Sequence, residues 1–126
     1  MTRRRFREGG GFEEAAAYAR AVRVAGHIAV SGTAAGATDR DAYGQAREAL
    51  DRAVAAVEHL GGTREDVLRT RLLLAPGCDW EGVVRAHRET FEGVDPANTT
   101  YFVGGFIPPG VLVEVELDAV VEEPPR

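Results

Sequence analysis

The feature that most constrains this chain is a nearly strict alternation of apolar and acidic residues over positions 111–121. Valine, leucine and alanine occupy the odd positions, and Glu114, Glu116 and Asp118 stand between them. A period of two is typical of a β-strand with one buried face, and branched side chains suit a pleated surface. The three carboxylates, roughly 7 Å apart along the strand, repel one another unless cations compensate them.

Arginines from a second strand can supply that compensation. In segment 67–74, Arg69 and Arg71 recur at the same spacing of two, and Arg20 or Arg23 are further candidates. Opposite charges that face each other across neighbouring strands stabilise a sheet. We therefore expect a sheet with an aliphatic inner face and an outer face of alternating acids and arginines.

Two amphipathic helices are predicted to cover the inner face. In segment 41–60 apolar residues recur at every third or fourth position, Asp39 or Asp41 can cap the start, and glycines 61 and 62 end the pattern. Segment 63–66 resembles a capping box with room for one helical turn. A second helix is predicted from a cap at Asp79 to about Phe91. Its expected apolar face consists of Trp80, Val83, Val84, His87 and Phe91.

The order of elements is strands, helix, strand, helix, strands. The strands are expected at 3–7, 19–24, 26–31, 67–74, 99–103 and 111–121. This order predicts an α+β fold, with a single mixed β-sheet and two helices packed on one face. The 126 residues fit a single domain, 1–126, with loose ends at about 1–2 and 122–126. Sister subunits of a symmetric oligomer would cover the open, charged face.

Composition and charge exclude several classes of protein. A net charge of −5 argues against a nucleic-acid partner, because phosphate binding requires Lys and Arg to neutralise the backbone. The basic cluster within 3–7 is therefore interpreted as a solvated edge strand rather than a nucleic-acid arm. The single cysteine, Cys78, allows no internal disulfide and fits a reducing cytoplasm. No apolar run is long enough to span a membrane, so we expect a cytoplasmic protein without membrane contact.

No motif for a cofactor or a metal stands out. The phosphate-binding glycine patterns are absent, and the three histidines lie far apart with no second ligand at metal spacing. We therefore predict no cofactor and no metal. Ser31 is the only serine and stands at a strand end rather than in a nucleophile elbow, and Cys78 is interpreted as a simple loop cysteine.

Polar and small residues at strand ends remain as candidates for a small-molecule site. They are Tyr18, Ser31, Gly32, Asn98, Thr99, Thr100 and Glu114. Glu114 is the first acid of the alternating strand and stands close to the turn at 108–110. A carboxylate in that place can remove a proton from water if burial raises its pKa. The alternative interpretation is structural, with Glu114 paired to Arg69 or Arg71.

Six segments, in the same order along the chain, resemble successive blocks of the Rid (reactive intermediate deaminase, YjgF-type) family. They are 14–22, 26–33, 65–71, 80–91, 96–99 and 112–119. The resemblance implies an α+β fold similar to bacterial chorismate mutase, assembled as a homotrimer with three pockets between subunits. It also implies the hydrolysis of enamine and imine intermediates to a keto acid and ammonia, without a cofactor.

The resemblance also implies roles for single residues. Glu114 would be the catalytic residue that positions the attacking water, and Tyr18, Ser31 and Gly32 would shape the substrate pocket. In the family an arginine grips the substrate carboxylate at the position where this chain has Asn98. A neutral amide cannot reproduce that charged, two-pronged grip. We therefore expect altered substrate choice, with Asn98 and Thr100 as polar anchors of the substrate.

Two functions follow from the sequence. The first is a Rid-like hydrolase or deaminase that acts on an enamine, imine or related reactive metabolite in a pocket between subunits. The alternative is a non-catalytic trimer of the same fold that binds a small metabolite as a sensor. The acidic balance argues against a third possibility, an RNA-cleaving protein.

Overall fold

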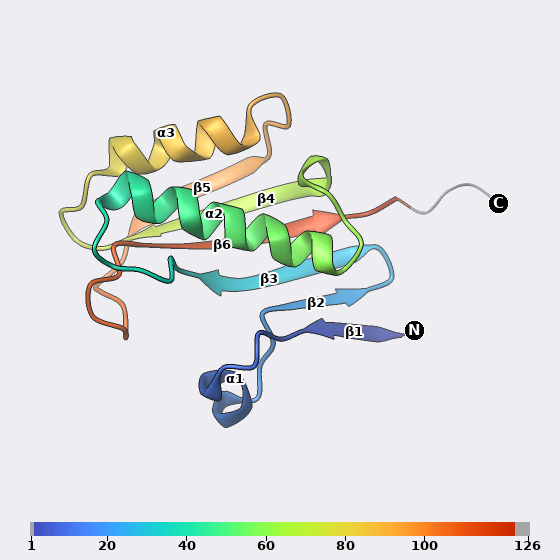
Figure 1. Ribbon diagram of the computed structural model, residues 1–126. Helices are drawn as coiled ribbons and strands as arrows, with labels where there is room; N and C mark the ends of the chain where they lie inside the picture. The colour runs from blue at the N-terminus through green and yellow to red at the C-terminus, as the bar shows by residue number, and fades with distance from the viewer. Residues whose placement is uncertain (1, 123–126) are drawn as a thin grey trace.

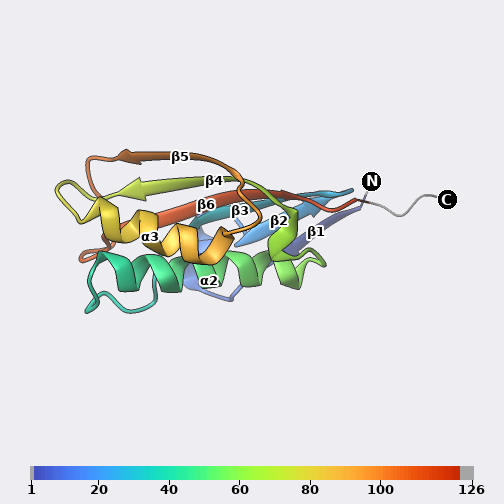
Figure 2. The same ribbon diagram turned by 90° about the horizontal axis from the view of Figure 1, so that it is seen from above.

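The computed structural model describes residues 2–122, which form one mixed sheet with its two long helices on one face (Figures 1 and 2). The elements are β1 (Arg3–Phe6), α1 (Gly11–Ala16), β2 (Ala21–Val24), β3 (His27–Thr33), α2 (Ala42–His59), the 3-10 turn η1 (Arg64–Asp66), β4 (Val67–Leu74), α3 (Trp80–Phe91), β5 (Ala97–Phe102) and β6 (Val113–Val120). The strand order is β1-β2-β3-β6-β4-β5, with β4 and β5 parallel and the other neighbours antiparallel. The predicted α+β fold is confirmed, and α1 adds a short third helix. The loose ends predicted at 1–2 and 122–126 lie largely outside the described residues.

Strand β6 lies inside the sheet, between β3 and β4, and carries the predicted alternation. Its inward side chains are Val113, Val115, Leu117 and Ala119, all buried. Its acids lie on the opposite face, where Nη1 of Arg71 is 3.5 Å from Oε1 of Glu116 and 3.9 Å from Oδ2 of Asp118. The expected pairing of acids and arginines is therefore present at Arg71, and Arg69 lies opposite Asp118 in the strand register.

Helix α2 covers the inner face through a stripe of small residues. The predicted stripe is buried throughout, at Ala42, Ala46, Ala49, Leu50, Ala53, Val57 and Leu60. Asp41 is the N-cap, with Oδ1 accepting a hydrogen bond from Gly44 N at 2.8 Å, and Gly61 follows the helix at φ +89°. Figure 2 shows α2 and α3 together on one side of the sheet, while the other side is open. Within the described residues no helix is both long enough and apolar enough to cross a membrane.

The apolar face predicted for the second helix is partly wrong. Val83 and Phe91 are buried as expected, but Trp80 is 51% exposed and Val84 is 42% exposed. Small residues occupy the contact with α2 instead. A Cβ on Gly82 would lie 2.6 Å from Oδ2 of the cap residue Asp79 and 3.3 Å from Cβ of Tyr43 on α2, so glycine suits both the cap and the close approach of the two helices. Close backbone packing, rather than the largest apolar side chains, sets the rotation of α3 about its axis.

Strands β1 and β2 are tied to the C-terminus of α2. The carbonyl oxygen of Leu60 accepts hydrogen bonds from Nη2 of Arg4 at 3.1 Å and from Nη1 of Arg23 at 2.8 Å. Cationic side chains at a helix C-terminus satisfy free carbonyls and favour the helix dipole. Strand β1 is thus an edge strand, as predicted for the basic cluster. Arg23 corrects one expectation, because it lies opposite the buried Ile28 and faces the helices instead of the acidic face.

Candidate functional site

A β-bulge in β3 places two neighbouring residues opposite one residue of β6. The register pairs Val30 with Leu117 and Thr33 with Val115, so Ser31 and Gly32 together face the single position of Glu116. Because Val30 and Thr33 are both buried, the two bulged residues lie toward the open face of the sheet. Bulges re-aim side chains and occur often beside functional sites. This bulge opens a space on the outer face beside β6.

Glu114 fills part of that space and lies directly against the backbone of Gly32. A Cβ added to Gly32 would lie only 2.6 Å from Oε1 of Glu114. Glycine is therefore required at position 32 for this position of the carboxylate. No described residue donates a hydrogen bond to Glu114, and the groups that affect its charge are Arg20 and Glu116. The carboxylate therefore remains available to a ligand or a water.

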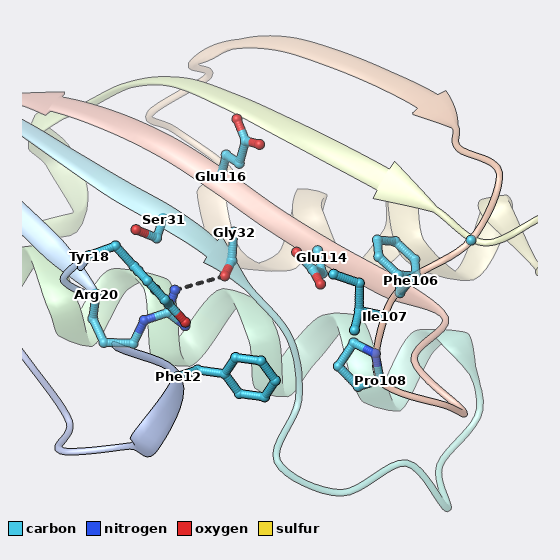
Figure 3. A pocket seen from close by; sticks show the side chains of 11 residues that line it. Phe12, Tyr18, Arg20, Ser31, Gly32, Phe106, Ile107, Pro108, Glu114 and Glu116 are labelled. Carbon is cyan, nitrogen blue, oxygen red and sulfur yellow. Dashed lines mark hydrogen bonds between the residues drawn. The ribbon is translucent and has the colours of Figure 1, made fainter. Parts of the chain in front are cut away.

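Around Glu114 lies an open pocket of about 490 Å³, a size typical of sites for small organic ligands. It is lined by Phe12, Tyr18, Arg20, Ser31, Gly32, Gly105, Phe106, Ile107, Pro108, Glu114 and Glu116. Figure 3 shows Phe12, Tyr18 and Arg20 on one side of this pocket and Phe106, Ile107 and Pro108 on the other, with Glu114 between them. The pocket therefore combines a carboxylate, a guanidinium and an apolar wall.

The environment of Glu114 favours its protonated form. Burial raises the pKa of this carboxyl above its usual value, the nearby Arg20 guanidinium opposes that rise, and Glu116 adds to it. Desolvation is the largest of the three effects, since no described residue donates a hydrogen bond to Glu114 in place of water. A raised pKa brings a carboxylate closer to neutral pH, where it can both accept and return a proton.

Two of the polar residues in the pocket are held by the backbone. Ser31 donates its hydroxyl proton to the carbonyl oxygen of Ala19 at 2.7 Å, which joins β3 to the chain before β2. Nη2 of Arg20 donates to the carbonyl oxygen of Gly32 at 2.9 Å (Figure 3). Its guanidinium carbon lies 5.6 Å from the ring centroid of Tyr18, within the range of a cation–π contact. The bulge, the arginine and the tyrosine therefore support one another.

Asn98 and Thr100 lie elsewhere, on the helix side of the sheet. Thr100 donates to Oδ1 of Asn98 at 2.8 Å, and Nδ2 of Asn98 donates to Oγ1 of Thr70 at 3.0 Å. Oγ1 of Thr70 is 2.7 Å from Nε2 of His87 on α3. Burial lowers the pKa of His87, which favours the neutral imidazole as an acceptor for the Thr70 hydroxyl. These four residues, which we call the Asn98 cluster, form a neutral chain of hydrogen bonds.

The structure thus gathers four of the six predicted site residues in one pocket: Glu114, Tyr18, Ser31 and Gly32. Asn98 and Thr100 face α3 on the opposite side, so their predicted contact with the substrate would require β5 of a neighbouring subunit. Sequence reasoning missed Arg20 as a member of the pocket. The signal was present, since Ala19 and Ala21 are buried and alternation puts Tyr18 and Arg20 together on the other side.

The fold and the pocket define a class: a small α+β protein whose open sheet face carries a ligand-sized cavity around a half-buried glutamate. A family model described as "Endoribonuclease L-PSP" matches residues 9–121. The chain therefore belongs to this family, the YjgF/UK114 family, and the resemblance to YjgF-type proteins is confirmed.

Individual relatives agree with this assignment. The protein SCO2049 of Streptomyces coelicolor is 40% identical over 121 residues, which cover 92% of this chain and 90% of that protein. The crystal structure of Rv2704 from Mycobacterium tuberculosis, a member of the YjgF/YER057c/UK114 family, is 36% identical with a TM-score of 0.90. That comparison covers 95% of this chain and 100% of Rv2704. The YjgF gene product of E. coli is 26% identical with a TM-score of 0.76, over 83% of this chain and 88% of that one.

Proposed function

We propose that this protein is a cofactor-independent hydrolase of small imines or enamines, with Glu114 as the catalytic residue. The observation that carries the proposal is the state of Glu114: half-buried, without a hydrogen-bond donor among the described residues, and with its pKa raised by desolvation in a ligand-sized pocket. A structural glutamate paired to Arg69 or Arg71 would have the opposite character. Among the acids of β6 it is Glu116 and Asp118 that pair with Arg71.

The proposed reaction converts an imine and one water into a carbonyl compound and ammonia. The Glu114 carboxylate takes a proton from water as the water oxygen bonds to the imine carbon. The electron pair of the C=N bond moves to nitrogen, which receives that proton from Glu114. In the second half, the new hydroxyl gives its proton through Glu114 to nitrogen, the C–N bond breaks, and ammonia leaves. Glu114 ends as a carboxylate, so one group acts as base and acid in turn.

We further propose that the protein works as a homotrimer in which a neighbouring subunit closes this open pocket. The uncovered sheet face supports this proposal, since it carries Tyr101 at 44% exposure and Val120 at 41% exposure beside its charges. Exposed apolar groups on a charged face are typical of an interaction surface. Light scattering should give three times the chain mass of 13.5 kDa. A monomer would contradict the shared pocket.

The test of the catalytic proposal is ammonia and keto-acid formation from imines generated in place by an amino-acid oxidase. The wild type should accelerate hydrolysis of at least one imine, and Glu114→Gln should reduce that acceleration by about 10²–10⁴-fold, the usual contribution of a general base. Asp118→Asn is the matched control, because it removes a carboxylate from the same face of β6 outside the pocket lining.

Other outcomes would separate the alternatives. A Glu114→Gln variant as active as the wild type would overturn the assignment of Glu114. If no imine is turned over while a metabolite binds equally well to the wild type and to Glu114→Gln, the protein is a binding protein instead. Cleavage of RNA that follows the same variants would favour the activity in the description of the family, against the net charge of −5.

A further inference from the structure

Arg20 brings a positive charge into the pocket, and its contacts use only part of the hydrogen-bonding capacity of its guanidinium. Of its three nitrogens only Nη2 has a hydrogen-bond acceptor among the described residues, the carbonyl oxygen of Gly32. Nε is buried, has no acceptor within residues 2–122, and lies 3.9 Å from Oε1 of Glu8. That same Glu8 oxygen lies 2.8 Å from Nη2 of Arg52. A guanidinium offers five N–H donors, so the described part of the chain leaves most of these donors unused.

The two acids that line the pocket compensate Arg20 incompletely. Glu116 lies 3.5 Å from Arg71, which occupies its charge. Glu114 is the remaining carboxylate, and burial raises its pKa, so its charged form is less favourable here than that of an exposed glutamate. When Glu114 carries a proton, the positive charge of Arg20 is left without an equal partner inside the pocket. A buried or half-buried cation in that state favours an anionic ligand.

The opposite wall of the pocket is apolar and exposed. Phe12 is 69% exposed and Ile107 is 91% exposed, although both line the cavity with Phe106 and Pro108. Figure 3 shows these side chains around Glu114, with Phe12 on the Arg20 side and Ile107 across from it. Large apolar side chains exposed at the mouth of a cavity are typical of a surface that contacts a ligand. A ligand with an apolar body could contact these side chains over a much larger area than a very small polar acid could.

We propose that Arg20 is the anion-binding residue of this pocket, and that the ligand is a small organic acid with an apolar body. Its carboxylate binds the guanidinium of Arg20, its aromatic or branched body packs on Phe12 and Ile107, and its reacting carbon lies near Glu114. The last point rests on the proposed hydrolase function, whereas the binding of the acid does not. Specificity for the acid then comes from Arg20, just before β2, and Asn98 takes no part in holding it.

The experiment measures binding of phenylpyruvate, a stable aromatic 2-oxo acid, by calorimetry on the full chain. Phenylpyruvate should bind the wild type about 10-fold or more tightly than its neutral methyl ester, the loss expected when a charge-assisted grip disappears. Arg20→Gln should lose that preference for the acid. Arg20→Lys should keep part of it, because the charge stays and the fork is lost. Arg69→Gln is the control, since it removes a positive charge from the same sheet face outside the pocket lining.

Each outcome decides the matter. Any of three results would overturn the proposal. The wild type could bind the acid and the ester equally, Arg20→Gln could bind the acid as tightly as the wild type does, or the wild type could fail to bind the acid. If Arg20→Gln fails to fold by circular dichroism, the comparison of acid with ester and the Arg20→Lys variant still decide. Loss of imine hydrolysis in Glu114→Gln with normal acid binding in Arg20→Gln would reject only the role of Arg20. Binding of the acid through Arg20 without any imine turnover would reject only the hydrolase.

Discussion

Two groups of polar side chains lie on opposite faces of one sheet, and they differ in whether their polar atoms have hydrogen-bond partners. In the Asn98 cluster each link from Thr100 to His87 is a hydrogen bond of 3.0 Å or less. Its central member, Thr70, is fully buried. In the pocket on the other face, Glu114 has no described donor and Nε of Arg20 has no described acceptor.

This difference indicates which face of the sheet is expected to bind a ligand and carry out a reaction. A neutral network with satisfied hydrogen bonds has its low free energy within the folded chain, and it fixes the contact between β4, β5 and α3. Charged groups left unsatisfied in a cavity raise the free energy of the empty protein, and a ligand or a water can lower it. Such groups gather where proteins bind and react. We therefore assign structure to the Asn98 cluster and function to the pocket of Glu114 and Arg20.

The largest expected effect comes from a substitution that displaces Glu114 and leaves the Asn98 cluster unchanged. Gly32→Ala puts a Cβ 2.6 Å from Oε1 of Glu114, so the carboxylate must shift. We expect imine hydrolysis to fall by about 100-fold, as misplacement of a catalytic group by about 1 Å can cost that much. Gly36→Ala is the matched control, since its Cβ would meet Glu48 only at an ordinary 3.6 Å. Full activity of Gly32→Ala would show that the position of Glu114 is unimportant.

The next effect concerns stability on the helix side. Thr70→Val keeps the shape of a fully buried side chain but leaves Nδ2 of Asn98 and Nε2 of His87 without their partner. We expect a loss of about 1–3 kcal/mol in the free energy of unfolding, measured by urea denaturation. Thr99→Val, on the exposed face of β5, should change stability by less than about 0.5 kcal/mol. Lost hydrolysis with unchanged stability in Thr70→Val would reverse our assignment of the two faces.

The smallest effect is a pH-dependent gain of stability on removing the charge of Glu114. The pKa of Glu114 is raised in the folded protein above the ordinary value of 4.5. Between that value and the raised pKa the folded state binds more protons than the unfolded state, so stability falls as pH rises. Glu114→Gln should therefore melt higher than the wild type at neutral pH, and the difference should vanish near pH 4.

Solvent screens a half-buried group, so this gain should be only about 1–2 °C in the melting temperature. Asp118→Asn should show no such gain, because Asp118 lies 3.9 Å from the guanidinium of Arg71. A Glu114→Gln variant that is less stable than the wild type at neutral pH would mean that the carboxylate has a stabilising partner.

Much of the fold could be predicted because its signals are local. The alternation of β6 follows from one buried face, and the caps Asp41 and Asp79 each accept a hydrogen bond from a backbone N–H three residues on. The box at 63–66 forms as its sequence indicates, with Asp66 accepting from Thr63 N at 2.8 Å. Each of these features depends on residues within a few positions of one another.

The arrangement of the pocket depends on contacts that no local pattern encodes. The bulge at Ser31 and Gly32 shows only in the register against β6, and it is this bulge that brings Gly32 under Glu114. The direction of Asn98 was also hidden, since β5 is an edge strand exposed along most of its length. Without a buried face, a strand gives no indication of which way its side chains point. The sequence could therefore name Glu114 and Asn98 together but not reveal that the sheet separates them.

The most direct test of this account is a crystal structure of the protein grown with phenylpyruvate. We predict that the ligand carboxylate lies on the guanidinium of Arg20, with its carbonyl carbon beside Glu114 and its ring against Phe12 or Ile107. A ligand held instead by Asn98 and Thr100, with Arg20 still bound only to Gly32, would contradict it.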